Sequence, residues 1–405
     1  MGICIKEALK LIKKNIKQVS FEIVPIENSN GRISAETLKG TLSLPPFNNS
    51  AMDGYGVKGA DAGKEVKVID EIFAGSEKQT DIKTGQVVKI MTGARVPDSI
   101  ESVVPFELVE KIDNTTIKLP ENIKNKQHMR FIGEDIKKDE VILNQGETIN
   151  FATIALLTSQ GISHIKVYRK PKVSVFTSGE ELKLHYEQIK EYQIFNSNTP
   201  TLLSRVEELG ADVTFTGKAQ DTIESIKDMI QNSLYGDLII TTGGISVGEA
   251  DFTMEAFEQL NMEIIFNGIN IKPGKPTVFG KIKDTYVLNL PGNPLAASLI
   301  FEMFGTIIMQ TLSGSKDIFH NVIHTKLSED LDNKKGRTTI IPGDFNGESF
   351  SPAKKRFPGM VSVLHRCNSV MVLNRNLEYL NKNDSVKIIP INWMFFTDSS
   401  VDFFN

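Results

Sequence analysis

The sequence predicts a multidomain α/β protein whose central part is a doubly wound α/β domain. From about residue 169 to residue 316, apolar runs with strand composition alternate with amphipathic runs of helical spacing, which indicates a mostly parallel sheet covered by helices. Glycine-rich stretches stand where several of these strands pass into helices. The chain has 405 residues, more than one hydrophobic core normally supports, so we expect further domains around this one.

The first expected element is an amphipathic helix close to the N-terminus. Ile5, Ala8 and Ile12 recur at helical spacing, with lysines on the other positions. A second helical stretch, FATIALLTSQG, carries a glycine that can end it. We expect these two helices to pack together, so that residues 1–20 and 149–168 form one small helical linker domain.

The chain between these helices, residues 21–148, has the composition of an inserted β-rich domain. Its short strand-like runs, such as EVKVIDEIF and QVVKIM, alternate with loops of Gly, Pro and Asn. The last part, residues 317–405, shows similar runs, TTIIPG, SVMVLN and SVKIIP. We therefore expect a small C-terminal β domain there.

The α/β domain, residues 169–316, is predicted from the order of its elements. Strand-like runs are VSVF, VTFTG, DLIITTGG and YVLNLPGNP, and the helices between and after them include NTPTLLSRVEELG and DTIESIKDMIQNSL. Open sheets of this kind bind ligands beyond the carboxyl ends of their strands. The loops at those ends are therefore the candidate site.

The composition is that of a soluble globular protein. The chain is 40% hydrophobic and 24% charged, and its net charge of -4 argues against general coating of nucleic acid. Cys4 and Cys367 have no metal-type spacing, which suits a reducing compartment. Lysines interrupt the N-terminal apolar segment, and no run approaches the roughly 18 apolar residues of a membrane span. We expect a cytoplasmic protein with no nucleic-acid or membrane partner.

Three loops at the predicted strand ends suit phosphate. FTSGEEL, TTGGISVGEAD and LPGNP each follow an apolar strand and precede a helix, so their backbone N–H groups and helix dipoles converge on one rim. Between them, IKPGKP carries Lys272 and Lys275 on a loop stiffened by proline. These lysines supply fixed positive charge for an anion.

Carboxylates close to the same strand ends conflict with a bare phosphate site. They are Glu180, Glu181, Asp221, Glu249 and Asp251. Mg²⁺ resolves the conflict, because it binds a few carboxylates and takes its other ligands from phosphate and water. Plainer interpretations stay open: the glycines can serve only as turns, the two glutamates can simply favour a helix N-terminus, and the lysines can be surface lysines.

Two other stretches have different weight. HNVIH places His320 and His324 at a helical metal spacing, but its surroundings are β-like and no acid is adjacent, so a metal role is disfavoured. LPPFNNSAMDGYGV, residues 44 to 57, has no periodic apolar face that explains it.

Together, NNSAMDGYGV, IMTGARVPDSIESVV, GEDI, TSGEEL, TTGGISVGEADF, IKPGKP and LPGNP occur in an order that resembles the molybdopterin molybdenumtransferase family, of the MoeA and gephyrin E-domain type. The resemblance runs from the first helix into the terminal domain. It implies an elongated homodimer with a barrel-like C-terminal domain. It also implies a Mg²⁺-dependent reaction in which adenylylated molybdopterin releases AMP and its dithiolene receives molybdate. In such dimers the α/β rim of one subunit faces the inserted domain of the other, which gives a shared active site.

The resemblance assigns roles residue by residue. Functional acids are Asp53, Asp135, Glu181, Asp221 and Asp251, of which Glu181, Asp221 and Asp251 are the expected Mg²⁺ ligands. The expected substrate-binding residues are Gly243, Gly244, Ser246, Gly248, Lys272, Lys275, Pro276, Gly292, Asn293 and Arg337. A molybdopterin adenylyltransferase is the expected protein partner.

The sequence departs from the family pattern at three positions that concern oxyanion binding. Ala296 stands in the segment after LPGNP where a serine is common, Pro342 where an arginine is common, and Pro358 where a glycine-serine pair is expected. Two other functions stay open: a molybdopterin adenylyltransferase, because its α/β domain would look similar, and a gephyrin-like scaffold or binding paralogue without catalysis.

Overall fold

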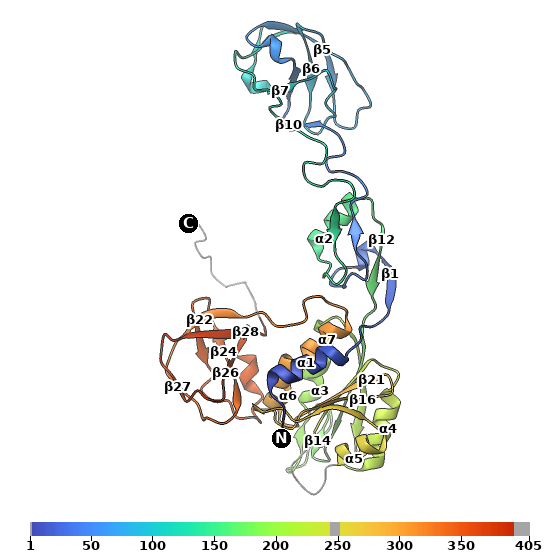
Figure 1. The fold of residues 1–405 in the computed structure, drawn as a ribbon, viewed down its shortest axis with the longest axis vertical. Coiled ribbons are helices and arrows are strands. Elements are labelled where there is room, and N and C mark those ends of the chain that lie inside the picture. Colours follow the sequence, from blue (N-terminus) through green and yellow to red (C-terminus); the bar gives the residue numbers. More distant parts are fainter. Residues whose placement is uncertain (1, 244–251, 393–405) are drawn as a thin grey trace.

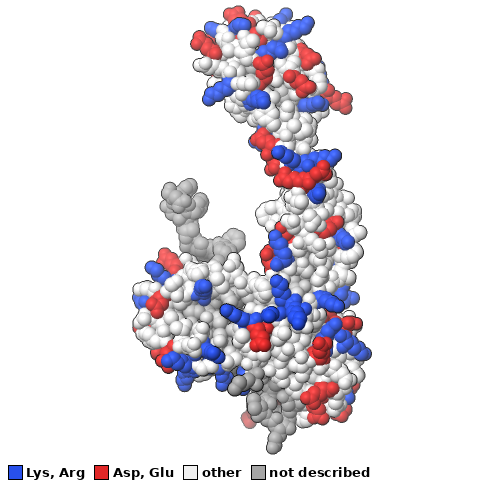
Figure 2. Space-filling view, viewed as in Figure 1, with Lys and Arg blue, Asp and Glu red and all other residues white. Residues whose placement is uncertain are grey.

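The computed structural model describes residues 2–243 and 252–392. The molecule is elongated: a β domain at one end is joined by a narrow stem to a broad body, in which the α/β domain and a C-terminal barrel lie side by side (Figure 1). Charges of both signs are interspersed over the end domain in Figure 2. The multidomain α/β fold predicted from the sequence is confirmed.

The end domain is built on a six-stranded sheet in the order β7-β4-β6-β5-β9-β8. The strands are β4 (Gly54–Val57), β5 (Glu65–Ile72), β6 (Gln86–Ile90), β7 (Ser102–Pro105), β8 (Glu110–Lys111) and β9 (Thr116–Lys118). At its base, β3 (Asn49–Ser50) pairs antiparallel with β10 (Met129–Arg130). Two apolar clusters, one on Val103 and one on Val104, are buried in this domain because successive strand residues point to opposite faces.

The stem contains two antiparallel strand pairs and one helix. β1 (Phe21–Pro25) pairs with β12 (His164–Tyr168), and β2 (Leu38–Lys39) pairs with β11 (Val141–Leu143). Helix α2 (Phe151–Ser159) starts at Asn150, whose side-chain oxygen accepts the Thr153 N–H at 2.9 Å. The side chains of Ile149, Leu157 and Val167 are fully buried in the small core of the stem.

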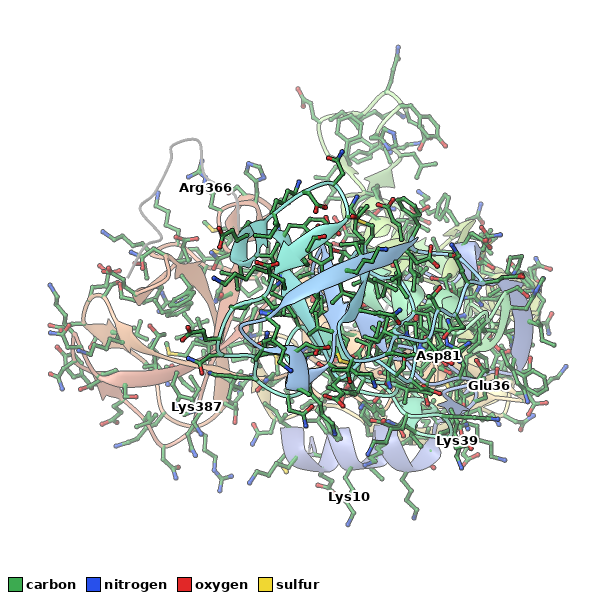
Figure 3. All side chains as sticks on the ribbon, turned by 90° about the horizontal axis from the view of Figure 1, so that it is seen from above. Lys10, Glu36, Lys39, Asp81, Arg366 and Lys387 are labelled. Atoms are coloured by element: carbon green, nitrogen blue, oxygen red, sulfur yellow. The ribbon has the colours of Figure 1, made fainter. Side chains whose placement is uncertain are left out.

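The sequence led us to expect that helix α1 (Ile5–Asn15) packs against α2, but it does not. Its buried residues Ala8 and Ile12 belong to the core of the α/β domain, where α1 contacts α7 (Thr306–Leu312) and β18 (Glu263–Asn267). Lys10 points outward from the opposite face (Figure 3). The helical pattern was right, but the expectation that this helix packs against the helix at 151–159 was wrong, whereas Val19 beyond it shares a small core with Tyr168. The apolar stripe shows that a helix packs, and it does not show against which element.

The α/β domain has a six-stranded sheet in the order β16-β13-β17-β21-β20-β18. β16 (Asp212–Ala219), β13 (Lys172–Ser178), β17 (Leu238–Thr242) and β21 (Thr285–Leu290) are parallel, while β20 (Val278–Ile282) pairs antiparallel with both β21 and β18. One face is covered by α1, α3 (Asn198–Glu208), α6 (Pro294–Ile300) and α7, the other by α4 (Ile223–Ser233) and α5 (Phe252–Gln259). The carboxyl ends of the parallel strands therefore meet at one edge.

The apolar segment Pro294–Leu312 is continuous in the structure: α6, a π-helical turn at Phe301–Gly305, and α7. Among the described residues it is the one helix that is long and apolar enough to span a membrane, judged by length and composition alone. However, 83% of its most apolar window is buried inside the protein. Its composition is explained by its position in the core of the α/β domain.

The C-terminal domain is a closed barrel. Its strands are β22 (Ile323–Leu327), β24 (Thr338–Phe345), β25 (Ser349–Pro352), β26 (Ser369–Leu373) and β28 (Ser385–Pro390), and each pairs with two neighbours in the ring β22-β25-β24-β26-β28. β23 (Leu331–Asp332) pairs with β27 (Tyr379–Leu380) beside it, and a short helix α8 covers Ser362–His365. One strand of the α/β domain, β19 (Ile271–Lys272), pairs in parallel with β24 and so joins the two domains.

Candidate functional site

Three of the predicted loops meet at one hollow of about 770 Å³ beyond the carboxyl ends of the parallel strands. It is lined by Ser178 at the end of β13 and Gly179 after it, by Gly243 after β17, and by Gly292 and Asn293 after β21. Glu181 and Asp221 line it as well, so we call it the acidic hollow. The prediction that these loops share one edge followed from parallel strand order, and this geometry agrees with it.

Close approach of backbones explains two of the glycines. Gly243 has φ +90°, and a Cβ on it would lie 3.0 Å from the carbonyl oxygen of Ser178. A Cβ on Gly292 would lie 3.5 Å from the Gly243 Cα. The Ser178 side chain is almost fully buried, and its Oγ has no hydrogen-bond partner within the described parts of the chain. The Ser178 Oγ is thus, within the described chain, an unpaired polar atom beside the hollow, with almost no surface of its own exposed to it.

The two described acids of the predicted Mg²⁺ set share the acidic hollow. Asp221 Oδ2 accepts the Glu180 N–H at 3.1 Å, which ties the loop after β13 to the loop after β16. The Glu181 carboxylate folds back over Gly179. A Cβ on that glycine would lie only 2.9 Å from the Glu181 Oε2. No group of three His, Cys, Asp or Glu side chains in residues 2–243 and 252–392 is arranged to hold a metal ion. Two carboxylates nevertheless suit Mg²⁺, which commonly completes its shell with substrate phosphate and water.

A second hollow of about 650 Å³ is lined by five cationic residues, and we call it the basic hollow. The cations are Lys272, Lys275, Lys334, Lys335 and Arg337. It shares three lining residues, Pro276, Pro291 and Asn293, with the acidic hollow. The two hollows are therefore neighbours in one depression between the α/β domain and the barrel.

Strand pairing explains how the cations come together. β19 pairs with β24 at Ile271 opposite Thr338 and Lys272 opposite Thr339, which brings the IKPGKP loop beside Arg337. Lys334 and Lys335 were missed in the sequence. The basic run KKGR directly before β24 was the available signal, but only the pairing between domains shows that it faces the other lysines.

The three departures from the family pattern lie in different surroundings. Ala296 and Pro358 line the basic hollow, and the Leu295 N–H donates to the Pro358 carbonyl at 3.0 Å. Pro342 lies inside β24, where its carbonyl accepts the Ala353 N–H at 2.9 Å. The first two positions therefore belong to the wall of the basic hollow, and Pro342 does not line it.

The remaining predicted acids of the described chain lie far from these hollows. Asp53 is in the end domain, where Oδ1 accepts the N–H of Thr92 at 2.7 Å and its hydroxyl at 2.8 Å. These hydrogen bonds, the backbone one first, lower the pKa of this exposed carboxyl below its ordinary value. Asp135 lies at the junction of stem and end domain, with its N–H on the Leu44 carbonyl at 2.9 Å. Within one chain, both are separated from the body by the stem (Figure 1).

Several predicted residues lie outside the described part of the chain. They are Gly244, Ser246, Gly248, Glu249 and Asp251. Their predicted roles stay predictions. The two histidines of HNVIH do lie inside it: the His320 Nε2 is 2.7 Å from the Glu302 carbonyl oxygen and 3.0 Å from the Thr306 hydroxyl, so it ties the start of the barrel to the core helix.

Known proteins resemble the chain over nearly its whole length. Residues 3–161 match the family model described as the MoeA N-terminal region (domain I and II), and residues 174–311 match the probable molybdopterin binding domain. A molybdopterin molybdenumtransferase of Staphylococcus epidermidis is 31% identical over 383 residues, which cover 92% of this chain and 91% of that protein. The chain belongs to the molybdopterin molybdenumtransferase family.

Other members of the molybdopterin molybdenumtransferase family support this assignment. The protein of that name from Haemophilus influenzae is 36% identical over 310 residues, which cover 75% of this chain and 76% of that protein. A crystal structure of a MoeA protein from Pyrococcus horikosii is 29% identical with a TM-score of 0.83, covering 97% of this chain and 100% of its own. A second structure, from Pyrococcus horikoshii OT3, is 25% identical with a TM-score of 0.85, covering 96% of this chain and 100% of its own. The similarity to these structures therefore extends to the arrangement of the domains.

Proposed function

We propose that this protein is a molybdopterin molybdenumtransferase, which inserts molybdenum into adenylylated molybdopterin and releases AMP to form the molybdenum cofactor. One observation supports this proposal above the others. The acidic hollow and the basic hollow adjoin at Pro276, Pro291 and Asn293, so carboxylates and cations face one depression. The pyrophosphate of the substrate needs carboxylates that can hold Mg²⁺, and an oxyanion bound next to it needs cations.

The residues of the acidic hollow bind and orient the pyrophosphate in this proposal. The loops at Gly243 and Gly292, which pack against each other backbone to backbone, form part of the wall against which the phosphate lies. Glu181 and Asp221 would hold Mg²⁺, together with Asp251 as the sequence predicts. When bound, Mg²⁺ neutralises charge that builds up as the pyrophosphate bond breaks.

The residues of the basic hollow hold molybdate, a substrate, beside the dithiolene. Lys272, Lys275 and Arg337 supply fixed positive charge on a backbone held by the β19–β24 pairing. Lys334 adds charge that compensates for the lack of a serine at Ala296, whereas Lys335 is paired with the Glu378 carboxylate at 2.8 Å. This compensation favours an active enzyme over a paralogue with reduced activity.

We propose a cytoplasmic homodimer with shared sites, because one chain cannot bring Asp53 to its own hollows (Figure 1). The stem exposes apolar side chains that suit a second copy: Ile23 is 68% and Phe151 is 84% exposed. Figure 2 shows a largely uncharged surface over part of the stem. Mixing an Asp53→Asn chain with an Asp221→Asn chain tests the shared site. Mixed dimers regain one intact site and part of the activity, whereas sites within one chain would stay inactive after mixing.

The test of the reaction is incubation of the purified protein with adenylylated molybdopterin, molybdate and Mg²⁺. Release of AMP together with active cofactor supports insertion. Consumption of ATP on unmodified molybdopterin would instead support an adenylyltransferase, the reaction that we assign to a partner protein. Binding without turnover would support a scaffold. Chelation of Mg²⁺ by EDTA is expected to stop AMP release, and unchanged release would contradict the metal assignment.

A further inference from the structure

One segment beside the acidic hollow exposes several large apolar side chains. It runs from β14 (Leu182–Lys183) to β15 (Ile194–Phe195), and we call it the aromatic segment. Tyr186 is 75%, Tyr192 is 70%, Ile194 is 58% and Phe195 is 46% exposed. In Figure 3 a pale green loop of the α/β domain projects from the molecule with several rings on it. Exposed apolar residues gathered in this way usually mark a binding surface.

Hydrogen bonds hold the backbone of the aromatic segment in a defined shape. Hydrogen bonds link its two strands: the Ile194 N–H donates to the Glu181 carbonyl at 3.0 Å, and the Asn196 N–H donates to the Lys183 carbonyl at 2.7 Å. The Glu187 carboxylate accepts the Leu184 N–H at 2.6 Å. The exposed side chains are therefore presented by an ordered backbone.

Two residues of the aromatic segment belong to the wall of the acidic hollow. Ile194 and Phe195 line it together with Ser178, Glu181 and Gly292. The bond from Ile194 to the Glu181 carbonyl fixes the apolar wall to the residue that carries one of the two acids. The hollow thus has a polar end suited to phosphate and an apolar side next to it.

A ligand with phosphate at the polar end would place its attached ring against the apolar side. Both ends of adenylylated molybdopterin carry a nitrogen heterocycle with a flat face: adenine, beyond the ribose, on one side of the pyrophosphate and the pyrimidine ring of the pterin on the other. A ring of this kind gains stability by stacking on Phe or by packing on an aliphatic side chain. A ligand made of phosphate alone cannot use this wall.

We propose that Phe195, supported by Ile194, is a specificity-determining residue that binds the flat heterocycle of the substrate in the acidic hollow. The inference rests on the proposed function for the identity of that substrate. Adenine and pterin share the chemistry that the wall recognises, and the experiment below distinguishes them. Tyr186 and Tyr192 lie on the same segment but are not among the described residues lining either hollow, so they give matched controls.

The test compares Phe195→Leu, which keeps an apolar side chain without a ring, with Phe195→Tyr, which keeps the ring. Calorimetry in the presence of Mg²⁺ measures the affinities for ADP, for 6-hydroxymethylpterin diphosphate and for inorganic pyrophosphate. We expect Phe195→Leu to weaken binding of the ligand whose ring uses the wall by about 5- to 30-fold, with pyrophosphate unchanged. Phe195→Tyr and the control Tyr186→Leu are expected to bind all three ligands like the wild type.

The outcomes separate this inference from the proposed function. Loss confined to ADP assigns the wall to adenine, and loss confined to the pterin diphosphate assigns it to pterin. Equal loss for pyrophosphate, no loss for either ring-bearing ligand, or the same loss in Tyr186→Leu would overturn the inference. Ring-dependent binding in a protein that inserts no molybdenum would leave the inference standing and contradict the proposed function. Molybdenum insertion with normal kinetics in Phe195→Leu, together with unchanged affinities, would support the proposed function and contradict the inference about Phe195.

Discussion

Replacement of Gly274 by alanine tests whether the position of the IKPGKP loop depends on its contact with the core helix. Gly274 has φ +104°, and a Cβ there would lie 2.2 Å from Cγ1 and 2.3 Å from Cδ1 of Ile300. Ile300 is fully buried in α6, so it has little space into which it can move. The Gly274 carbonyl also accepts the Thr277 hydroxyl at 2.7 Å, which restrains the loop.

Two costs add up in Gly274→Ala. A left-handed backbone costs a residue with a Cβ about 1–2 kcal/mol, and overpacking of a filled core costs about 1–3 kcal/mol. We therefore expect a loss of about 2–5 kcal/mol in the free energy of unfolding, measured by urea denaturation followed by circular dichroism. Gly210→Ala is the matched control in the same domain, because Gly210 has φ +83° and a Cβ there would meet nothing within 4 Å. It should lose only the backbone part.

A double variant isolates the clash. Ile300→Ala alone should destabilise by about 2–5 kcal/mol through its cavity, but the Gly274→Ala methyl then has room, so the two losses should not add. Calorimetry should also show weaker molybdate binding in Gly274→Ala, because the loop that carries Lys272 and Lys275 must move away from Ile300. Strictly additive losses, or equal losses in Gly274→Ala and Gly210→Ala, would refute the claim that this contact positions the loop.

Three further predictions concern single side chains. Lys334→Gln should lower molybdate affinity by a few-fold as measured by calorimetry, whereas Lys283→Gln, on the far hairpin of the α/β domain, should not; equal affinities in both would remove Lys334 from the site. Asp221→Asn keeps an acceptor for the Glu180 N–H, so AMP release should fall sharply while the urea midpoint stays near wild type, and a large loss of stability would indicate a structural role instead. Burial lowers the pKa of His320 below its ordinary value, so its contribution to stability is complete above that value and is lost as the pH falls. The urea midpoint of the wild type should therefore fall relative to that of His320→Gln between about pH 7 and pH 5. The same pH dependence of the midpoint in both proteins would contradict this.

Local patterns in the sequence were sufficient for the elements and for the edge that carries the acidic hollow. Parallel strand order places the loops at Gly179, Gly243 and Gly292 on one edge whatever the details of packing. Patterns could not show which surface a helix covers, so the predicted packing partner of α1 was wrong. They also could not show Lys334, because that residue reaches the site through the barrel, which is separated from IKPGKP by the core helix along the chain.

The aromatic segment shows a different limit of the sequence. Its exposed rings follow no period of 2 or 3.6 residues, so they gave no signal of a helix face or a strand face. The parallel pairing of β14 with β15 brings Ile194 and Phe195 to the hollow. Binding surfaces formed by short irregular segments depend on such tertiary contacts.

The parallel pairing of β19 with β24 has a mechanical consequence. Where two domains are linked only by a flexible connection, each can turn without disturbing the other, but here a shared ladder at Ile271 and Lys272 crosses the boundary. Substitutions deep in the barrel, such as at Ile341 or Met371, which pair across β24 and β26 in the barrel core, can therefore shift the lysines of the neighbouring domain. The shape of the basic hollow therefore depends partly on packing in the barrel, away from the residues that line the hollow.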